Sequence, residues 1–390
     1  MHQFGTNAYH VVVVGGSFAG LMAAQELEKQ AAHLNVYITV IDKREASFHN
    51  ISSLRALVDP SLAPKLWIPF DRALQGKRSR IIQAAVAEVH PHHLVLSDGR
   101  HMTFDILLLA TGSDYPSPAK IDSLYVQPGI EETRRHQRHI KQAQRVLIIG
   151  GGAVGVELAG EIASEYPDKT VTLVQAKHQL LPDEYHPGFR EKARQALEKL
   201  GVHVELNDRV IVPGSQPIRD CPDTRTLRTV NGLEIDSDLQ FLCIGTVVNT
   251  PYLHTLGEDD GVLTEPATGY IKVLPTLQLE YPRYRHIFAI GDCNNLPGAK
   301  LAYKAESQAK VVAKNVRRML ERISHSEDAS NAKLATYKDP GAVMAVTIGR
   351  DITYNAFPFA NLIGWRDVAR KGVDLFLPKR YQQMNIPYPK

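Results

Sequence analysis

Two glycine-rich loops carry the clearest chemical signal in this sequence. The second loop has the complete G-x-G-x-x-G pattern and reads Gly150, Gly151, Gly152, Ala153, Val154 and Gly155. The first glycine of such a pattern permits a tight turn, the second lets the backbone approach a pyrophosphate, and the third lets helix and strand pack closely. The N–H groups at the helix N-terminus then attract phosphate. We therefore predict a dinucleotide site that uses Gly150, Gly152 and Gly155.

The first loop has the same pattern with one change. It reads Gly15, Gly16, Ser17, Phe18, Ala19 and Gly20. Ser17 takes the place of the middle glycine, and its small hydroxyl can still donate to a phosphate. Asp42 follows Gly20 by about 20 residues, the position from which a carboxylate accepts hydrogen bonds from an adenosine ribose. We expect these six loop residues and Asp42 to bind a second dinucleotide.

The second unit lacks the acidic residue. Gln175 stands at the corresponding position and is followed by Ala176 and Lys177. A carboxylate would repel a ribose 2′-phosphate, whereas an amide with a nearby cation would not. We predict that Gln175 contacts the coenzyme and that NADPH is accepted beside NADH, with a solvated surface position as the alternative for Lys177.

The elements that position both loops are strands followed by helices. The expected strand–helix–strand series are 11–14, 18–30 and 36–41, then 146–149, 154–165 and 170–175. A hairpin is expected within 94–104, further strands at 202–206, 239–244 and 287–290, and a long helix at 302–320. This order predicts an α/β fold with two Rossmann-like dinucleotide-binding domains and a small C-terminal α+β module.

Composition sets the limits of the class. The 390 residues are 44% hydrophobic and 22% charged, and 45 basic residues against 42 acidic ones give a net charge of +3. These values exclude a wholly disordered chain and give little reason to expect nucleic-acid binding. The sequence has no apolar run long enough for a transmembrane helix.

The cysteines and the N-terminus bear on location. Cys221, Cys243 and Cys293 form no C-x-x-C pair, which excludes a local dithiol redox centre and favours a reducing compartment. The first ten residues do not resemble a signal peptide, and His2 stands where myristoylation needs glycine. We expect a cytoplasmic protein, or one peripheral on a membrane that faces the cytosol.

Two further segments resemble a known superfamily. Residues 103–112, which end in Ala110, Thr111 and Gly112, resemble the ATG strand of two-dinucleotide-domain flavoproteins, and residues 286–292 resemble their second FAD fingerprint. Within it, residues 47–50, 54–56, 155–157 and 371–376 look like the apoptosis-inducing-factor homologues, the group that includes the ferroptosis-suppressor NAD(P)H:quinone reductase and is related to type II NADH dehydrogenases. The implied division is an FAD domain at 1–121 and 251–325, an NAD(P)H domain at 122–250 and a C-terminal module at 326–390.

The resemblance also implies roles for individual residues. FAD would contact the first loop, the ATG segment Ala110, Thr111 and Gly112, and the residues Arg55, Val86 and Asp292, with Asp292 on the ribityl chain. Glu157 would lie near the nicotinamide, and Lys371 and Phe376 near the flavin or a quinone. The chain departs from the pattern at Ser17 and at His49, where some relatives have two histidines.

The expected reaction moves a hydride from NAD(P)H to FAD and then electrons to a quinone-type acceptor, with oxygen as a slow default. One alternative is a flavin reductase for a protein or radical acceptor. Another is an NAD(P)H-sensing flavoprotein that binds a partner or DNA, for which basic residues at 366, 370, 371, 379 and 380 give a weak indication.

Three further expectations concern the surface and the oligomeric state. The residues Trp365, Leu375, Phe376 and Leu377 either form a membrane-facing patch or pack on the FAD domain. We expect no metal site, because the crowded histidines at 90–93 are typical of a surface loop, and we expect Cys293 to be a small buried residue. The expected state is a monomer or homodimer.

Overall fold

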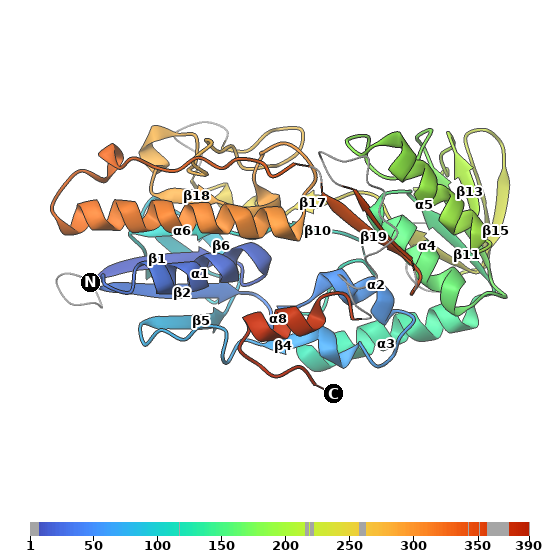
Figure 1. The fold of residues 1–390 in the computed structure, drawn as a ribbon, viewed down its shortest axis with the longest axis horizontal. Helices are drawn as coiled ribbons and strands as arrows, with labels where there is room; N and C mark the ends of the chain where they lie inside the picture. The colour runs from blue at the N-terminus through green and yellow to red at the C-terminus, as the bar shows by residue number, and fades with distance from the viewer. Residues whose placement is uncertain are drawn as a thin grey trace.

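A computed structural model gives the fold of the chain (Figure 1). It describes residues 8–116, 118–214, 218, 222–256, 263–341, 343–350, 352–356 and 374–389, with the backbone alone at 331 and 352–356. Lys371, Trp365 and Cys221 lie outside the described residues, so the role predicted for Lys371 stays a prediction.

The first half is built on a five-stranded parallel sheet in the order β18-β9-β1-β2-β5. Its strands are β1 (Tyr9–Val14), β2 (Val36–Asp42), β5 (Ser79–Gln83), β9 (Ile106–Leu109) and β18 (Ile287–Ala289). Alternate residues of β1 enter two different buried clusters, with Val11 and Val13 on one face and Val12 and Val14 on the other. Strands buried on both faces need continuous apolar runs, which is the pattern that the sequence has here.

Two helices cover one face of this sheet, α1 (Phe18–Gln30) and α6 (Ala302–Ser324), which lie side by side in Figure 1. The antiparallel strands β6 (Val86–Val89), β7 (His93–Leu96) and β8 (His101–Thr103) contribute to the buried cluster on the other face. A small ribbon of β3 (Ala46–Phe48) and β4 (Trp67–Pro69) and the short helix α2 (Ser53–Ala56) follow β2 along the chain.

The second half repeats the plan with four parallel strands in the order β13-β12-β11-β16. These are β11 (Arg145–Ile149), β12 (Thr170–Gln175), β13 (His203–Leu206) and β16 (Leu239–Leu242). Its helices are α4 (Ala153–Glu165) and α5 (Pro187–Lys199), and β14 (Arg225–Arg228) pairs with β15 (Glu234–Ser237) beside the sheet. The α/β class with parallel Rossmann-like sheets is therefore confirmed.

One pair of short strands and one helix connect the halves. The short strands β10 (Ser113–Asp114) and β17 (Val247–Val248) pair antiparallel where the chain leaves the first half and returns to it. The helix α3 (Val126–Gln142) buries Ile130 in a cluster with the first half and Ile140 in a cluster with the second. Short 3-10 turns complete the chain at Asn50–Ser52, Pro64–Leu66, Pro251–Leu253, Pro282–Tyr284, Gly291–Cys293 and Ala329–Asn331.

The described C-terminal residues also contact both halves. The hairpin of β19 (Met344–Ile348) and β20 (Ile352–Ala356) lies beside α4, and Met344, Val346 and Ile348 enter the core of the second half. The helix α8 (Leu377–Gln383) buries Leu377 and Tyr381 in a cluster with Trp67 of the first half. Leu377 therefore packs against the protein, as one of the two predicted alternatives for this segment required.

Candidate functional site

The first glycine loop leaves the N-terminus of α1 open. Gly15 has a φ of 104°, and a Cβ at Gly20 would overlap the carbonyl oxygen of Gly15. Both positions therefore require glycine in this turn. The helix begins at Phe18, and the Ser17 side chain makes no capping hydrogen bond. The N–H groups of the first turn are therefore available to an anion.

Asp42 lies at the end of β2, directly beside this loop. Its Oδ2 accepts a hydrogen bond from the Gly16 N–H at 2.6 Å, and its Oδ1 accepts one from the Arg44 N–H at 2.8 Å. Burial raises the pKa of Asp42, while the two backbone donors act in the opposite direction. A carboxylate oxygen can accept more than one hydrogen bond, so Asp42 still has acceptor capacity for a hydroxyl group.

A cavity of about 1060 Å³ opens at this loop and extends to the second half. It is large enough for more than a drug-sized ligand, for which pockets of about 300–1,000 Å³ are typical. Its wall includes a large share of the residues that the sequence nominated: Gly15, Ser17, Phe18, Ala19, Asp42, Val86, Ala110, Thr111, Gly112, Glu157, Asp292 and Phe376. Gly16 and Gly20 do not line the cavity.

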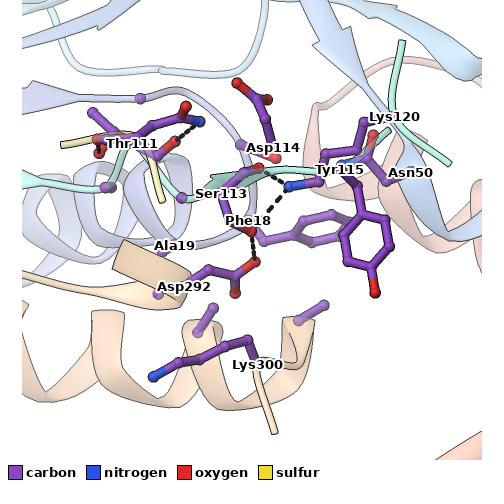
Figure 2. Close-up of a pocket in the computed structure, with 18 of the residues that line it drawn as sticks. Phe18, Ala19, Asn50, Thr111, Ser113, Asp114, Tyr115, Lys120, Asp292 and Lys300 are labelled. Carbon is purple, nitrogen blue, oxygen red and sulfur yellow. Dashed lines mark hydrogen bonds between the residues drawn. The ribbon is translucent and has the colours of Figure 1, made fainter. Parts of the chain in front are cut away.

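Two partly buried lysines lie near Asp292 in this wall (Figure 2). Its Oδ2 accepts a hydrogen bond from Ser113 Oγ at 3.0 Å, and the Lys120 ammonium donates to the backbone oxygen of Ser113. Lys300 approaches from the opposite side and donates to the carbonyls of Asn294 and Leu296. Burial lowers the pKa of both lysines, and the charge of Asp292 acts against that shift. The carboxylate is thus held between two positive groups.

The second glycine loop borders the same cavity through Ala153 and Val154, whereas the predicted residues Gly150, Gly152 and Gly155 do not line it. A Cβ at Gly155 would overlap the carbonyl oxygen of Gly150, whereas one at Gly152 would meet open space. Ala153, Val154 and Glu157 of α4 line the cavity. Glu157 Oε1 accepts hydrogen bonds from the N–H and the hydroxyl of Thr347, at 3.0 and 3.1 Å. The strand β19 therefore fixes the carboxylate that we expected near the nicotinamide.

Gln175 supports the loop, although it does not line the cavity. Its Oε1 accepts a hydrogen bond from the Gly151 N–H at 3.2 Å. The ammonium group of Lys177 lies 2.6 Å from the Asp183 carboxylate, with both side chains more than half exposed. The cation that would accompany a 2′-phosphate is therefore already shared with an acid.

The structure gives Arg55 a different position from the one that the sequence suggested. Its guanidinium is 1% exposed, lies 2.7 Å from Glu161 Oε1 and donates to the carbonyl oxygen of Gly349 at 2.8 Å. A buried guanidinium needs a carboxylate close by, and this pairing directs Arg55 toward α4 instead of into the cavity. Its neighbours Ser53 and Leu54 line the cavity in its place.

His49, Phe376 and α8 close the remaining side. The Nε2 of His49 lies 3.0 Å from the carbonyl oxygen of Leu375, so it carries the proton and donates. Burial lowers the pKa of His49 to about 4, so the ring is neutral near pH 7. Phe376 has a φ of 66° and lines the cavity. Cys293 is fully buried, as expected, and burial raises its pKa to about 11.

Sequence reasoning missed four polar groups of the wall: Ser113, Lys120, Lys300 and Arg380. None belongs to a recognisable motif, and lysines at unpatterned positions usually indicate solvated surface. Lys120 is far from Asp292 in sequence, and the fold alone brings the two together. Arg380 was noted only as one of several basic residues near the C-terminus, and no sequence signal placed any of the four in the cavity.

The site fits two dinucleotides. The open N-terminus of α1 and Asp42 suit the pyrophosphate and ribose of FAD, and the N-terminus of α4 suits a second pyrophosphate at the same cavity. This arrangement defines a flavoprotein with two dinucleotide-binding units. A family model for pyridine nucleotide-disulphide oxidoreductases matches residues 9–309, and the chain belongs to that family. It is an FAD-dependent NAD(P)H oxidoreductase.

Comparison with individual proteins agrees with this assignment. The chain is 33% identical to ferroptosis suppressor protein 1 of Taeniopygia guttata, over 97% of this chain and 96% of that protein. It is 30% identical to apoptosis-inducing factor homolog B of Dictyostelium discoideum, over 97% of both. Its fold is similar to the sulfide:quinone oxidoreductase of Aquifex aeolicus, with a TM-score of 0.70, 18% identity, and coverage of 92% of this chain and 86% of that one.

Two kinds of feature are absent from the described residues. No helix among them is long and apolar enough to cross a membrane. No three histidine, cysteine or acidic side chains in the described part of the chain are grouped so that they could hold a metal ion.

Proposed function

We propose that the chain passes electrons from NAD(P)H through FAD to a small quinone-type acceptor. The observation that carries this proposal is a single cavity bounded by both glycine loops and, on its remaining side, by His49, Phe376 and α8. FAD, when bound, would supply the hydride-accepting and electron-donating chemistry. The remaining side would leave room for an acceptor next to it.

The residues of the wall would bind and orient. The N-terminus of α1 would hold the FAD pyrophosphate, Asp42 the adenosine ribose and Asp292 the ribityl hydroxyls. Glu157, fixed by Thr347, would orient the nicotinamide amide. In terms of segments, 1–121 and 251–325 would form the FAD domain, 122–250 the NAD(P)H domain and 326–390 the C-terminal module.

An external acceptor fits the cysteine chemistry. Cys243 and Cys293 are both buried, and burial raises the pKa of both thiols, to about 12 and about 11. A thiol with a raised pKa is a poor nucleophile at neutral pH. The sequence also has no C-x-x-C pair. A diffusible quinone therefore suits the cavity better than a protein disulfide.

An anaerobic two-step experiment tests the function. The purified protein should show a flavin spectrum that bleaches with NADH or NADPH and returns when a short-chain soluble quinone is added. Asp292→Asn should lower the flavin content, while Asp71→Asn, an exposed position outside the cavity, should not. Bleaching without recovery in the presence of quinone would point to a protein acceptor or to an NAD(P)H sensor instead.

A further inference from the structure

Arg380 lies on α8 at the side of the cavity that neither glycine loop forms. It is 4% exposed and lines the cavity. Its guanidinium lies over the ring of Phe18, 5.0 Å from the centroid. It donates to Ser47 Oγ at 3.1 Å and to Gln383 Oε1 at 3.3 Å. The side chain is therefore fixed in one place by an aromatic face and two neutral acceptors.

The charge of Arg380 has no direct counter-ion among the described residues. The acid whose charge acts on it is Glu306, whose Oε1 accepts a hydrogen bond from Gln383 Nε2 at 3.4 Å. Burial lowers the pKa of Arg380 to about 10, and the charge of Glu306 only partly opposes this shift. Arg55, equally buried, has Glu161 in contact. Arg380 is thus a buried cation at the cavity wall that no acid among the described residues contacts.

We propose that Arg380 is a catalytic residue of the acceptor half-reaction, which donates hydrogen bonds to an oxygen of the acceptor as negative charge develops there. This proposal rests on the proposed function. The substrate class that fits is a planar quinone, because its ring would pack near Phe18 and Phe376 and its carbonyl oxygen would meet the guanidinium.

The electrons and protons of the overall step balance. NAD(P)H loses a hydride, which carries two electrons and one proton, and becomes NAD(P)⁺. The quinone gains two electrons and two protons and becomes a quinol, so that two C=O groups become two C–OH groups, and water supplies the second proton. A preorganised donor at the developing oxyanion raises the rate of this step by a factor of about 10².

The test separates the two half-reactions. Arg380→Gln removes the charge and keeps hydrogen-bonding capacity, Arg380→Lys keeps the charge, and Arg72→Gln changes an exposed arginine outside the cavity. Each variant is reduced anaerobically with NADH and then mixed with menadione, a neutral naphthoquinone. For Arg380→Gln we expect an unchanged rate of reduction and a reoxidation rate about 10²-fold lower. Arg380→Lys should recover part of the loss, and Arg72→Gln should match the wild type.

A binding measurement gives a readout that does not depend on turnover. 2-Hydroxy-1,4-naphthoquinone is an anion at neutral pH, and its dissociation constant is measured by the change it causes in the flavin spectrum of the oxidised protein. Arg380→Gln should weaken its binding at least about tenfold, because a charge-assisted hydrogen bond is lost. The affinity for neutral menadione should change less.

The outcomes are distinguishable. In one outcome, the wild type and Arg380→Gln react equally fast with menadione and bind the anion equally well. The role proposed for Arg380 is then wrong, while the proposed function stands. If no quinone reoxidises the wild type but anion binding depends on Arg380, the binding role stands and the proposed function is wrong. If Arg380→Gln does not retain flavin, Arg380→Met, which fills the site with an apolar chain, takes its place. Equal losses in both half-reactions would show a structural role and overturn the proposal.

Discussion

A single imidazole in the cavity wall shows how burial selects a charge state. His49 is 2% exposed and uses its Nε2–H on the carbonyl of Leu375. Desolvation is the main reason that its pKa falls from 6.5 to about 4, and the nearby charge of Arg380 acts in the same direction. The folded protein therefore keeps this ring neutral at a pH where the unfolded chain would protonate it.

This difference predicts a pH dependence of stability. Below pH 6.5 the unfolded state binds a proton at His49 that the folded state does not bind until about pH 4, so stability is lost as the pH falls through this window. His49→Gln should reduce the loss of unfolding free energy between pH 7.5 and pH 5 by about 2 kcal/mol. Urea titrations at both values measure this quantity. The exposed His203, changed to Gln, is the control, and an equal loss in the His49 variant and the wild type would contradict the prediction.

Among the elements, the loop between β11 and α4 contains two glycines with different roles, Gly152 and Gly155. The strand and helix can meet closely only because Gly155 has no side chain beside the Gly150 carbonyl. Gly152 is the N-cap of α4 and has an ordinary negative φ, with no protein atom within 4 Å of where a Cβ would stand. Gly155 is therefore needed for the packing of the fold, and Gly152 leaves open the space where a pyrophosphate would lie.

Alanine at the two positions should therefore act differently. Gly155→Ala should lower the free energy of unfolding by roughly 1–3 kcal/mol through overpacking. Gly152→Ala should leave stability within about 0.5 kcal/mol and raise the KM for NAD(P)H. Thermal unfolding and steady-state kinetics of both variants separate these effects. An unchanged KM in Gly152→Ala would mean that the coenzyme does not approach the loop.

At the scale of the whole molecule, one buried ion pair joins three segments that are distant in sequence. Arg55 belongs to α2 in the first half, Glu161 to α4 in the second, and Gly349 follows β19 near the C-terminus. Both charged side chains are 1% exposed. Since the cavity lies between the halves, the orientation of its two loops depends on this contact.

Replacing one partner of this pair should destabilise the protein more than replacing both. Arg55→Met leaves the Glu161 carboxylate buried without its partner and should lower the free energy of unfolding by about 3–5 kcal/mol. The double variant with Glu161→Met should recover a large part of that loss. Burial already raises the pKa of Glu161. The penalty of Arg55→Met should therefore shrink at acidic pH, where the acid accepts a proton. Urea unfolding of the wild type, Arg55→Met, Glu161→Met and the double variant checks both statements, and additive losses of unfolding free energy would contradict the role of the pair.

The two strand–loop–helix units could be predicted from the sequence alone. The apolar strands, the glycine turns and the acid at the end of β2 are local patterns, and the predicted helix at 18–30 and strand at 170–175 match α1 and β12 residue for residue. Only local sterics and side-chain periodicity are needed for these elements, so they can be read without knowledge of the fold.

The pairing of the charges depends on the tertiary structure. Arg55 resembled a flavin contact in sequence, but the packing of α2 on α4 pairs it with Glu161. Lys120, Lys300 and Arg380 belong to no motif, yet the fold buries Arg380, partly buries the two lysines, and brings all three to one cavity. The energy of a buried charge depends on its solvent exposure and on partners far away in sequence, and neither is encoded in the neighbouring residues.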